Sequence, residues 1–378
     1  MFNKKHNNFI NISFGIITAV LVFYVLGTGK SFIIPFVIAL LLSFAIIGLS
    51  NFYKSFKIPA FISFTLSIFT YGAIFWLVGK IIEANYDDFV KLAPEYFETI
   101  SGIVQTLGDR VFGFLDIEKP ESFRQLFSNV NPAQLFNRIS SGVLEITGQL
   151  GIIIFYTLFL LLEYRYAPSK LDLMFSDGLA KKKIFNVLNQ IQSDVKSYFV
   201  IKASVSFFVG LFSYTIMMIF GLEFAIFFAF IIFLLNFIPN IGSIIAVLFP
   251  VLFSLVQFES LYLTSIFLAL MIGVQILMGN FVEPKFVGNK LNLSPLVIIL
   301  SLVFWGKLWG VAGMFLSVPI MVIINIVLAA IPSTRSLAIL FSEKGVLKLS
   351  DDDVNTTTKK LVKDLKKKLQ DTKKQLKK

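Results

Sequence analysis

The first residues of this chain that could do chemistry surround a break in a long apolar segment. Residues 223–255 are interrupted by Asn236-Phe-Ile-Pro239-Asn240-Ile-Gly242. Proline and glycine break a helix, and lipid cannot satisfy the backbone groups that the break leaves free. Such groups must be buried in protein or face water, and broken helices of this kind form substrate sites in many transporters. We therefore expect these four residues to line a solute site. The alternative is a kinked helix whose asparagines satisfy the kink.

A second polar group follows the apolar span at 261–278. Gln275, Gly279 and Glu283 recur every four residues, so they share one face of a helix. Charge at the membrane end of a span is costly unless it is hydrated or paired, which makes Glu283 a candidate for exchanging a proton or a cation. The alternative is a loop carboxylate at the cytoplasmic surface. The candidate site residues of this group are Gln275, Asn280, Glu283, Pro284, Lys285 and Gly288.

The last apolar segment, 294–330, is too long for one span and is interrupted at Gly306, Lys307 and Gly310. Its first half, roughly 11 residues, is shorter than the 20 or so that cross the hydrocarbon. This favours a re-entrant hairpin that holds Lys307 at or near the membrane interior. Two full spans are the alternative, and they would bring Lys307 to the far surface.

Other kinds of chemistry find little support in the residues present. The chain has one histidine, His6, and no cysteine. That excludes a Ser-His-Asp triad in the membrane, an HExxH zinc site and thiol catalysis. No GxxxxGK[ST] sequence is present to bind ATP. We therefore expect no catalytic residue, no metal, no cofactor and no enzymatic activity. Three charged residues at the ends of predicted spans are expected to be interfacial anchors: Glu163, Lys202 and Glu223.

The elements that must position these residues are membrane helices. Of 378 residues, 56% are hydrophobic and only 15% are charged, whereas soluble domains are about 25% charged. No window alternates as the strands of a membrane barrel do. The predicted fold class is all-α: a polytopic α-helical membrane protein with about eight membrane segments, including broken or re-entrant hairpins, and a small helical external segment. Besides the two interrupted blocks, the predicted spans are 9–26, 31–50, 59–82, 143–162, 197–220 and 261–278.

The net charge of +11 is best explained by membrane topology. Basic residues mark cytoplasmic loops, and the basic segments fall on one side if the first four spans alternate. Both termini are therefore predicted to be cytoplasmic, and no nucleic-acid partner is expected. The predicted layout is 1–83, three spans; 84–142, external helical domain; 143–164, fourth span; 165–196, cytoplasmic amphipathic segment; 197–330, membrane core; and 331–378, a basic tail that could form a coiled coil.

The stretch FIPNIGSIIAVLFPVLFSL and the later NFVEPKFVGNKLNLSPLVIILSLVFWGKLWGVAGMFLSVPI resemble the autoinducer-2 exporter (PerM-like permease) family of bacterial multi-pass membrane proteins. The resemblance covers roughly 198–328, and Ser294 stands where the family usually has histidine. It implies an inner-membrane protein. Some members are linked to export of autoinducer-2, and others to sodium(lithium)/proton antiport. The matching residues are Pro239, Gly242, Asn280, Glu283, Pro284, Lys285, Gly288, Pro295, Gly306, Gly310, Gly313 and Pro319.

We therefore expect a secondary transporter or permease that works without ATP. Its partners would be a small polar solute, or a monovalent cation or proton, and the lipid bilayer; a homo-oligomer is left open. Asn236, Asn240 and Gln275 would supply neutral hydrogen bonds, and Glu283 would be the coupling carboxylate. The alternatives are a sodium(lithium)/proton antiporter and a non-transporting scaffold that holds partners with its external domain and tail.

Overall fold

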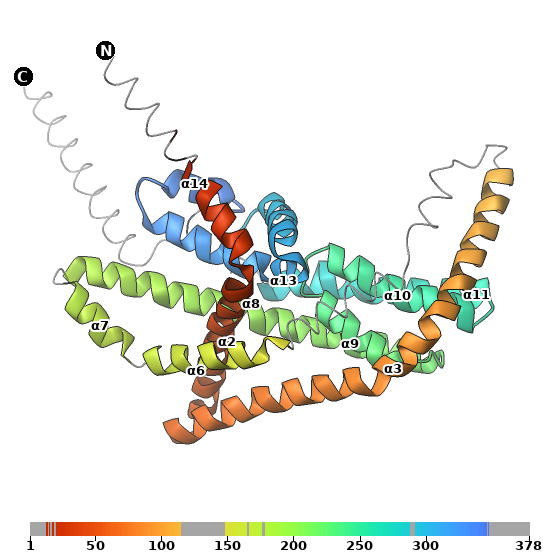
Figure 1. Ribbon diagram of the computed structural model, residues 1–378, viewed down its shortest axis with the longest axis horizontal. Coiled ribbons are helices and arrows are strands. Elements are labelled where there is room, and N and C mark those ends of the chain that lie inside the picture. Colours follow the sequence, from red (N-terminus) through yellow and green to blue (C-terminus); the bar gives the residue numbers. More distant parts are fainter. Residues whose placement is uncertain are drawn as a thin grey trace, which may run out of the picture.

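The computed structural model describes residues 13–114 (without 14, 16 and 19), 148–164, 166–175, 178–287, 292–345 and 347. Most of these residues are helical, and none of them forms a strand (Figure 1). The predicted all-α, polytopic membrane fold is confirmed.

Five helical stretches within the described ranges are long and apolar enough to cross a membrane. A sixth is formed by α6 (Leu150–Tyr164) and α7 (Ala167–Met174) if this pair, bent by 59°, is counted as one span. Of the predicted span at 9–26, the structure describes only the C-terminal part, which is helical from residue 20 to residue 28. The five stretches are Lys30–Ser55 in α2, Ala60–Ile81 in α3 (Ala60–Phe114), Lys181–Ile219 in α8 (Gly178–Ile219), Leu261–Phe286, and Pro295–Ala330, which is α13.

Two helices continue past the span ends that we predicted. Helix α3 has 55 residues and joins the third predicted span to the first part of the predicted external domain at 84–142. Helix α8 has 42 residues and joins the cytoplasmic amphipathic segment to the fifth span. The predicted domain boundaries at 83 and 196 fall inside these helices. The assignment of the flanking parts to opposite sides of a membrane stays a prediction, and 115–147 lies outside the described residues.

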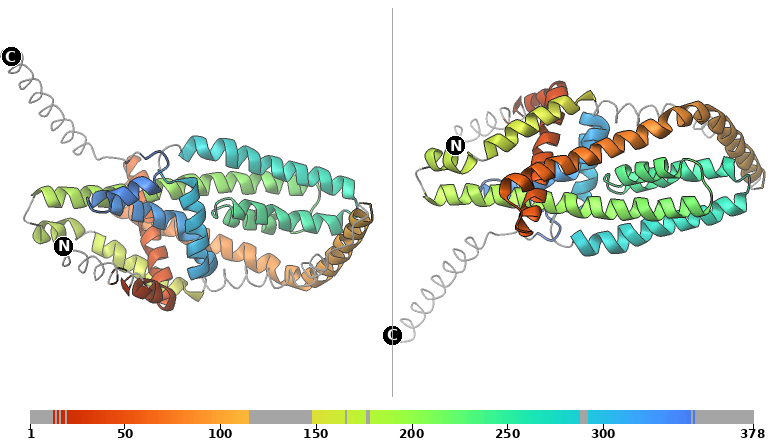
Figure 2. Two further views of the ribbon diagram at one scale, coloured as in Figure 1. Left: turned by 90° about the horizontal axis from the view of Figure 1, so that it is seen from above. Right: turned by 90° about the horizontal axis from the view of Figure 1, so that it is seen from below.

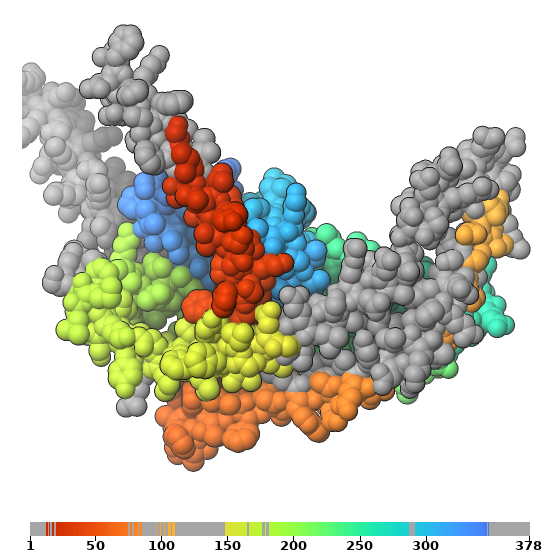
Figure 3. Space-filling view, in the orientation of Figure 1, coloured from red at the N-terminus to blue at the C-terminus, as the bar shows by residue number. Residues whose placement is uncertain are grey.

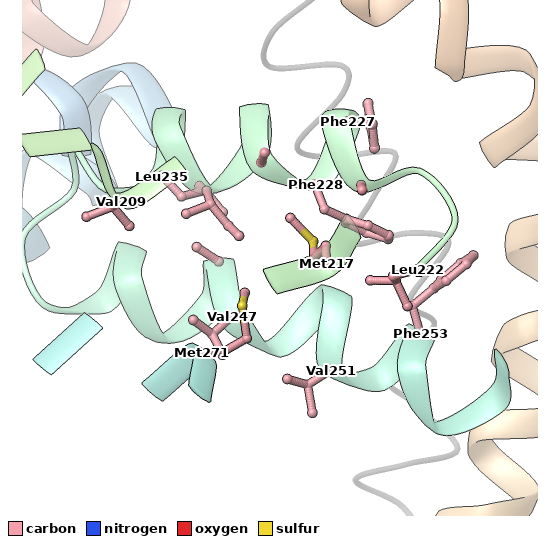
Figure 4. Close-up of a cluster of buried hydrophobic side chains, with 14 of the residues drawn as sticks. Val209, Met217, Leu222, Phe227, Phe228, Leu235, Val247, Val251, Phe253 and Met271 are labelled. Atoms are coloured by element: carbon pink, nitrogen blue, oxygen red, sulfur yellow. The ribbon is translucent and has the colours of Figure 1, made fainter. Parts of the chain in front are cut away.

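The first interrupted block folds back on itself as a helical hairpin. Helices α9 (Ala225–Leu235) and α10 (Ile241–Gln257) lie side by side, and the ring centroids of Phe228 and Phe253 are 5.2 Å apart (Figure 4). The 11 residues of α9 extend about 16 Å. This is only about half of the hydrocarbon thickness, so α9 is too short to cross the membrane.

The second interrupted block is also a hairpin, and it turns at Gly310. This glycine has φ 64° and ψ −141°, a conformation that side chains disfavour and glycine tolerates. The hydroxyl of Ser301 on the first arm donates a hydrogen bond to the carbonyl of Ser317 on the second, at 3.1 Å. The first arm extends about 22 Å, so it too is short for a span. The two arms therefore pack against each other as a hairpin, and the re-entry of this hairpin into the membrane stays a prediction.

Helix α8 is the central element of the fold. It packs against α9, α13, α2 and the run formed by α11 (Leu261–Ile276), η1 (Leu277–Val282) and α12 (Glu283–Val287). Figure 2 shows α8 alongside the α9–α10 hairpin and α11. The first hydrophobic cluster lies between these helices and includes Val209, Met217, Phe228, Phe253 and Met271. The second lies between α8 and α13 and includes Val195, Trp305, Trp309, Leu316 and Val322.

Helix α2 packs between the second hairpin and several of the other helices. It packs against α3, α6, α8 and α13, and in the space-filling view the red N-terminal segment runs down to the yellow α6, with the blue α13 beside it (Figure 3). The indole N–H of Trp309, at the turn of α13, donates a hydrogen bond to the carbonyl of Leu26 at 2.9 Å. The second hairpin is therefore held against the first membrane segment.

Candidate functional site

An ion pair between a buried lysine and a half-buried glutamate forms the centre of the candidate site. The Lys202 Nζ on α8 lies 2.6 Å from the Glu283 Oε1 on α12, and the side chains are 6% and 24% exposed. Removing two charges from water costs several kcal/mol each, and close pairing with good geometry is needed to offset that cost. The expectation that Lys202 is an interfacial anchor was wrong: its side chain points into the protein, because a carboxylate from a distant segment meets it there.

The position of Glu283 depends on a local widening of the helix. The N–H of Glu283 donates to the carbonyl of Met278, five residues earlier, and 277–282 forms a π-helical turn. Pro284 has no N–H to donate, and its ring would clash with the carbonyl of Asn280 in a regular α-helix. The wider turn relieves this conflict, and such turns are frequent at functional sites. The sequence Glu283-Pro284 thus starts a new helix with the carboxylate at its first residue.

The turn of the first hairpin meets α8 one helical turn beyond the ion pair. The side-chain amide of Asn236 donates a hydrogen bond to the Ser206 Oγ at 2.9 Å, and both residues are buried. Residues four apart share one face of a helix, so Ser206 and Lys202 face the same side of α8. The hairpin turn, the central helix and the ion pair therefore meet at one place in the interior.

The base of the same hairpin lies at the far end of α8. The Gln257 side chain donates to the carbonyl of Gly221 at 2.7 Å and accepts a hydrogen bond from the N–H of Glu223 at 2.9 Å. Glu223, expected to be an anchor, thus lies at this base, just beyond the end of α8 at Ile219. From there the hairpin extends back to Ser206, about 20 Å along the helix. It enters and leaves at the same end, as a re-entrant element does.

Two glycines allow the arms of the hairpins to close. A Cβ at Gly242 would lie 1.8 Å from the carbonyl oxygen of Leu235, and one at Gly313 would lie 1.9 Å from that of Trp305. Backbone atoms cannot move aside as the end of a flexible side chain can, so only glycine fits. Both glycines therefore serve the packing of a hairpin turn.

The two hairpins touch through aromatic rings. Phe237, next to Asn236, stacks on Phe315 of α13 with ring centroids 4.7 Å apart. Phe315 also contacts Phe199 of α8, at 6.4 Å between centroids. The contact lies near both hairpin turns, since Phe315 follows Gly310 by five residues. Any movement that separates the hairpins must break this stack.

Two polar groups, one on α8 and one on α11, are buried and have no hydrogen-bond partner among the residues that the structure describes: the Tyr198 hydroxyl and the Gln275 Nε2. Tyr198 lies one turn before Lys202 on α8 and within electrostatic range of Glu283. Gln275 lies on α11, which packs against α8. Buried polar groups are nearly always hydrogen-bonded, so exceptions call for an explanation. Both groups can hydrogen-bond a polar solute.

The other candidate residues take no part in the ion pair. Asn240 is exposed in the first hairpin turn with φ 60°, and Pro239 beside it is half-buried. Lys307 is exposed near the turn of the second hairpin, where Gly306 packs its backbone against Met314. Asn280, Pro284 and Lys285 are exposed around η1 and α12. Gly288 lies outside the described residues. Of the predicted polar residues, the structure thus brings Asn236 to the ion pair and leaves Asn240 at the surface.

Sequence reasoning missed the contribution of α8. Tyr198, Lys202 and Ser206 are spaced by four residues and form a polar line along one face of an apolar span. That spacing is a signal that could have identified them. Among the described residues, no three His, Cys, Asp or Glu side chains lie close enough to hold a metal ion. The site instead offers one carboxylate, one ammonium group and several neutral hydrogen-bonding groups. Such groups can bind a cation, a proton or a polar solute.

These features define the class of protein. It is a polytopic helical membrane protein in which two helical hairpins meet a long central helix near a partly buried ion pair.

The family comparison identifies the group within that class. The family model described as AI-2E family transporter matches residues 14–333, so this chain belongs to the AI-2E transporter family, and the resemblance found in the sequence is confirmed. The AI-2 transport protein TqsA of Escherichia coli is 27% identical over 326 residues, covering 82% of this chain and 89% of that protein. A Borreliella burgdorferi protein named "Putative transport protein" is 27% identical over 318 residues, covering 83% and 85%. The chain is a membrane transporter or permease.

Proposed function

We propose that this chain is a secondary transporter of the bacterial inner membrane that moves a small polar solute or a monovalent cation without ATP. The observation that carries the proposal is the partly buried Lys202–Glu283 pair, which lies one turn along α8 from the hydrogen bond between Ser206 and Asn236 of the first hairpin turn. Irregular backbone within a membrane protein is tolerated where it is buried in protein or lines a path for solute. Intramembrane charges that pair with each other mark such paths.

Two kinds of solute suit the site. Glu283 can exchange a proton or a monovalent cation, and the neutral groups of Asn236, Ser206 and Gln275 can hydrogen-bond a polyol-like molecule. The relative TqsA is named an AI-2 transport protein, which makes autoinducer-2 a candidate of the second kind. The cation alternative is favoured by a specific observation: the only charges at the centre of the described site are one carboxylate and the ammonium group that pairs with it.

The test is transport by the purified full chain in liposomes, with sodium, lithium and protons screened first and autoinducer-2 second. Glu283→Gln keeps the shape of the side chain and removes its charge. We expect it to reduce cation-coupled flux at least tenfold, because the amide cannot compensate a bound cation. Glu259→Gln, which alters an exposed carboxylate in the loop before α11, is the matched control and should retain flux within twofold.

Folding of each variant is checked by size-exclusion chromatography and a thermal melt in detergent. Normal flux through a folded Glu283→Gln variant would contradict the role of this carboxylate. A wild-type chain that moves none of the tested solutes would contradict the transport proposal for these substrates.

A further inference from the structure

The Lys202 ammonium group occupies the position that a monovalent cation would take at Glu283. Its Nζ lies 2.6 Å from Oε1, which is close to the distance at which carboxylates hold bound cations. Lys202 is also tethered to α8, whereas Glu283 belongs to the separate run of α11, η1 and α12. The pair thus joins two elements of the fold by a contact that a free cation could replace.

We propose that Lys202 is a tethered cation that competes with the transported cation for Glu283, and thereby allows the empty transporter to return. The inference rests on the proposed function above and names a monovalent cation as its substrate. An unpaired carboxylate in a low-dielectric interior carries a large desolvation cost. With Lys202 bound, the empty site keeps a compensated carboxylate, so the transporter can change conformation without cargo.

The surroundings of Lys202 can accept its ammonium group when a cation displaces it. The Tyr198 hydroxyl lies one turn before Lys202, is buried, and has no partner among the described residues. The Ser206 Oγ lies one turn after it on the same face. Both residues are four positions from Lys202 and share its face of α8, so their oxygens are the neighbouring acceptors for a long, flexible lysine side chain. The unpartnered hydroxyl of Tyr198 would then accept a hydrogen bond from the Lys202 ammonium group in place of Glu283.

The inference predicts that exchange and net transport depend differently on Lys202. Exchange of labelled for unlabelled sodium across a liposome needs only the loaded transporter. Net uptake also needs the empty transporter to return. Lys202→Met removes the ammonium group and keeps most of the apolar stem, so exchange should stay within threefold of wild type while net uptake falls at least tenfold. Lys202→Arg retains a cation and should restore net uptake to within about threefold of wild type.

The outcomes separate this inference from the proposed function. Equal loss of exchange and net uptake in Lys202→Met, or equal retention of both, would overturn the tethered-cation role while transport itself stands. A wild-type chain that moves neither sodium nor lithium overturns this inference and the cation alternative together. A purely structural lysine would change both rates in proportion to the amount of folded protein.

A second measurement needs no variant and so does not depend on the folding of Lys202→Met. Reductive methylation of wild-type protein, followed by peptide mass spectrometry, reports the access of reagent to each lysine. Saturating sodium should raise the labelling rate of Lys202 at least threefold over choline at equal ionic strength. Lys80, whose ion pair with Glu83 is exposed, is the control and should not change. An unchanged Lys202 rate would count against displacement.

Discussion

Asn236 joins two elements that lie far apart in the sequence. Its amide reaches Ser206, 30 residues earlier, and this hydrogen bond is buried. Sequence reasoning identified Asn236 and Asn240 together, because both flank the break. The structure separates them: Asn236 faces α8 and Asn240 faces outward. Asparagines beside a helix break indicate that a hydrogen-bonding side chain is needed there. Packing decides which of the two asparagines makes that hydrogen bond.

At this scale we predict a measurable coupling between Asn236 and Ser206. Asn236→Leu keeps side-chain volume but leaves a buried hydroxyl unpaired, which should cost about 1–3 kcal/mol of stability. Ser206→Ala removes the acceptor, and the double variant should lose less than the sum of the single changes. Thermal melts in detergent measure each step. Ser204→Ala, on an exposed face of α8, is the control. Strict additivity would show that the hydrogen bond contributes nothing.

The two hairpins are the elements that organise the site. Each arises from an apolar block with a turn signal in its middle, and each has an arm too short to cross the hydrocarbon. Their turns meet near Phe237 and Phe315, beside the face of α8 that carries the ion pair. Both turns depend on glycines at which the facing backbone comes closer than a Cβ would allow.

At the element scale we predict that Gly242→Ala and Gly313→Ala disrupt the hairpins. The added Cβ would overlap a backbone oxygen in both cases, so the turn must open. We expect a loss of about 3 kcal/mol, the upper end of the usual range for overpacking of a core, seen as a lower melting temperature and poor recovery from the membrane. Gly273→Ala, with no atom within 4 Å of the added Cβ, should be neutral or slightly stabilising. Similar behaviour of all three variants would contradict the close approach.

The orientation of the whole molecule in the membrane is predicted by its charged residues and can be measured directly. The basic residues Lys54 and Lys57 predict that the loop between α2 and α3 lies in the cytoplasm. The loop between α10 and α11, which contains Glu259, lies at the opposite end of the membrane part of α8, because it adjoins the base of the first hairpin. The two loops should therefore lie on opposite sides of the membrane.

The chain contains no cysteine, so single cysteines can be introduced without altering others. We predict that Lys57→Cys is labelled by an impermeant maleimide in inside-out vesicles and Glu259→Cys in right-side-out vesicles. A membrane-permeant maleimide, applied to both preparations, shows that each thiol is reactive. Labelling of both positions from the same side would contradict the predicted topology.

The sequence by itself determined the class, the helices and the breaks in them. Few charges and long apolar runs leave only membrane helices, and prolines and glycines mark interruptions whose short flanks indicate hairpins. It also identified Glu283 and Asn236 as polar groups in an apolar setting. These features follow from composition and from local spacing, and both can be read directly from one amino-acid sequence.

Only the tertiary structure decided which groups meet. Lys202 and Glu283 are 81 residues apart, and nothing in the local sequence of either residue indicates the other. The length of α8 and the widened turn before Pro284 bring the two side chains to the same level along the axis of α8. The hairpins that pack against α8 then shield the pair from solvent. Pairing across such a distance depends on how whole helices lie against one another, so it can be read from their arrangement and not from their spacing in the chain.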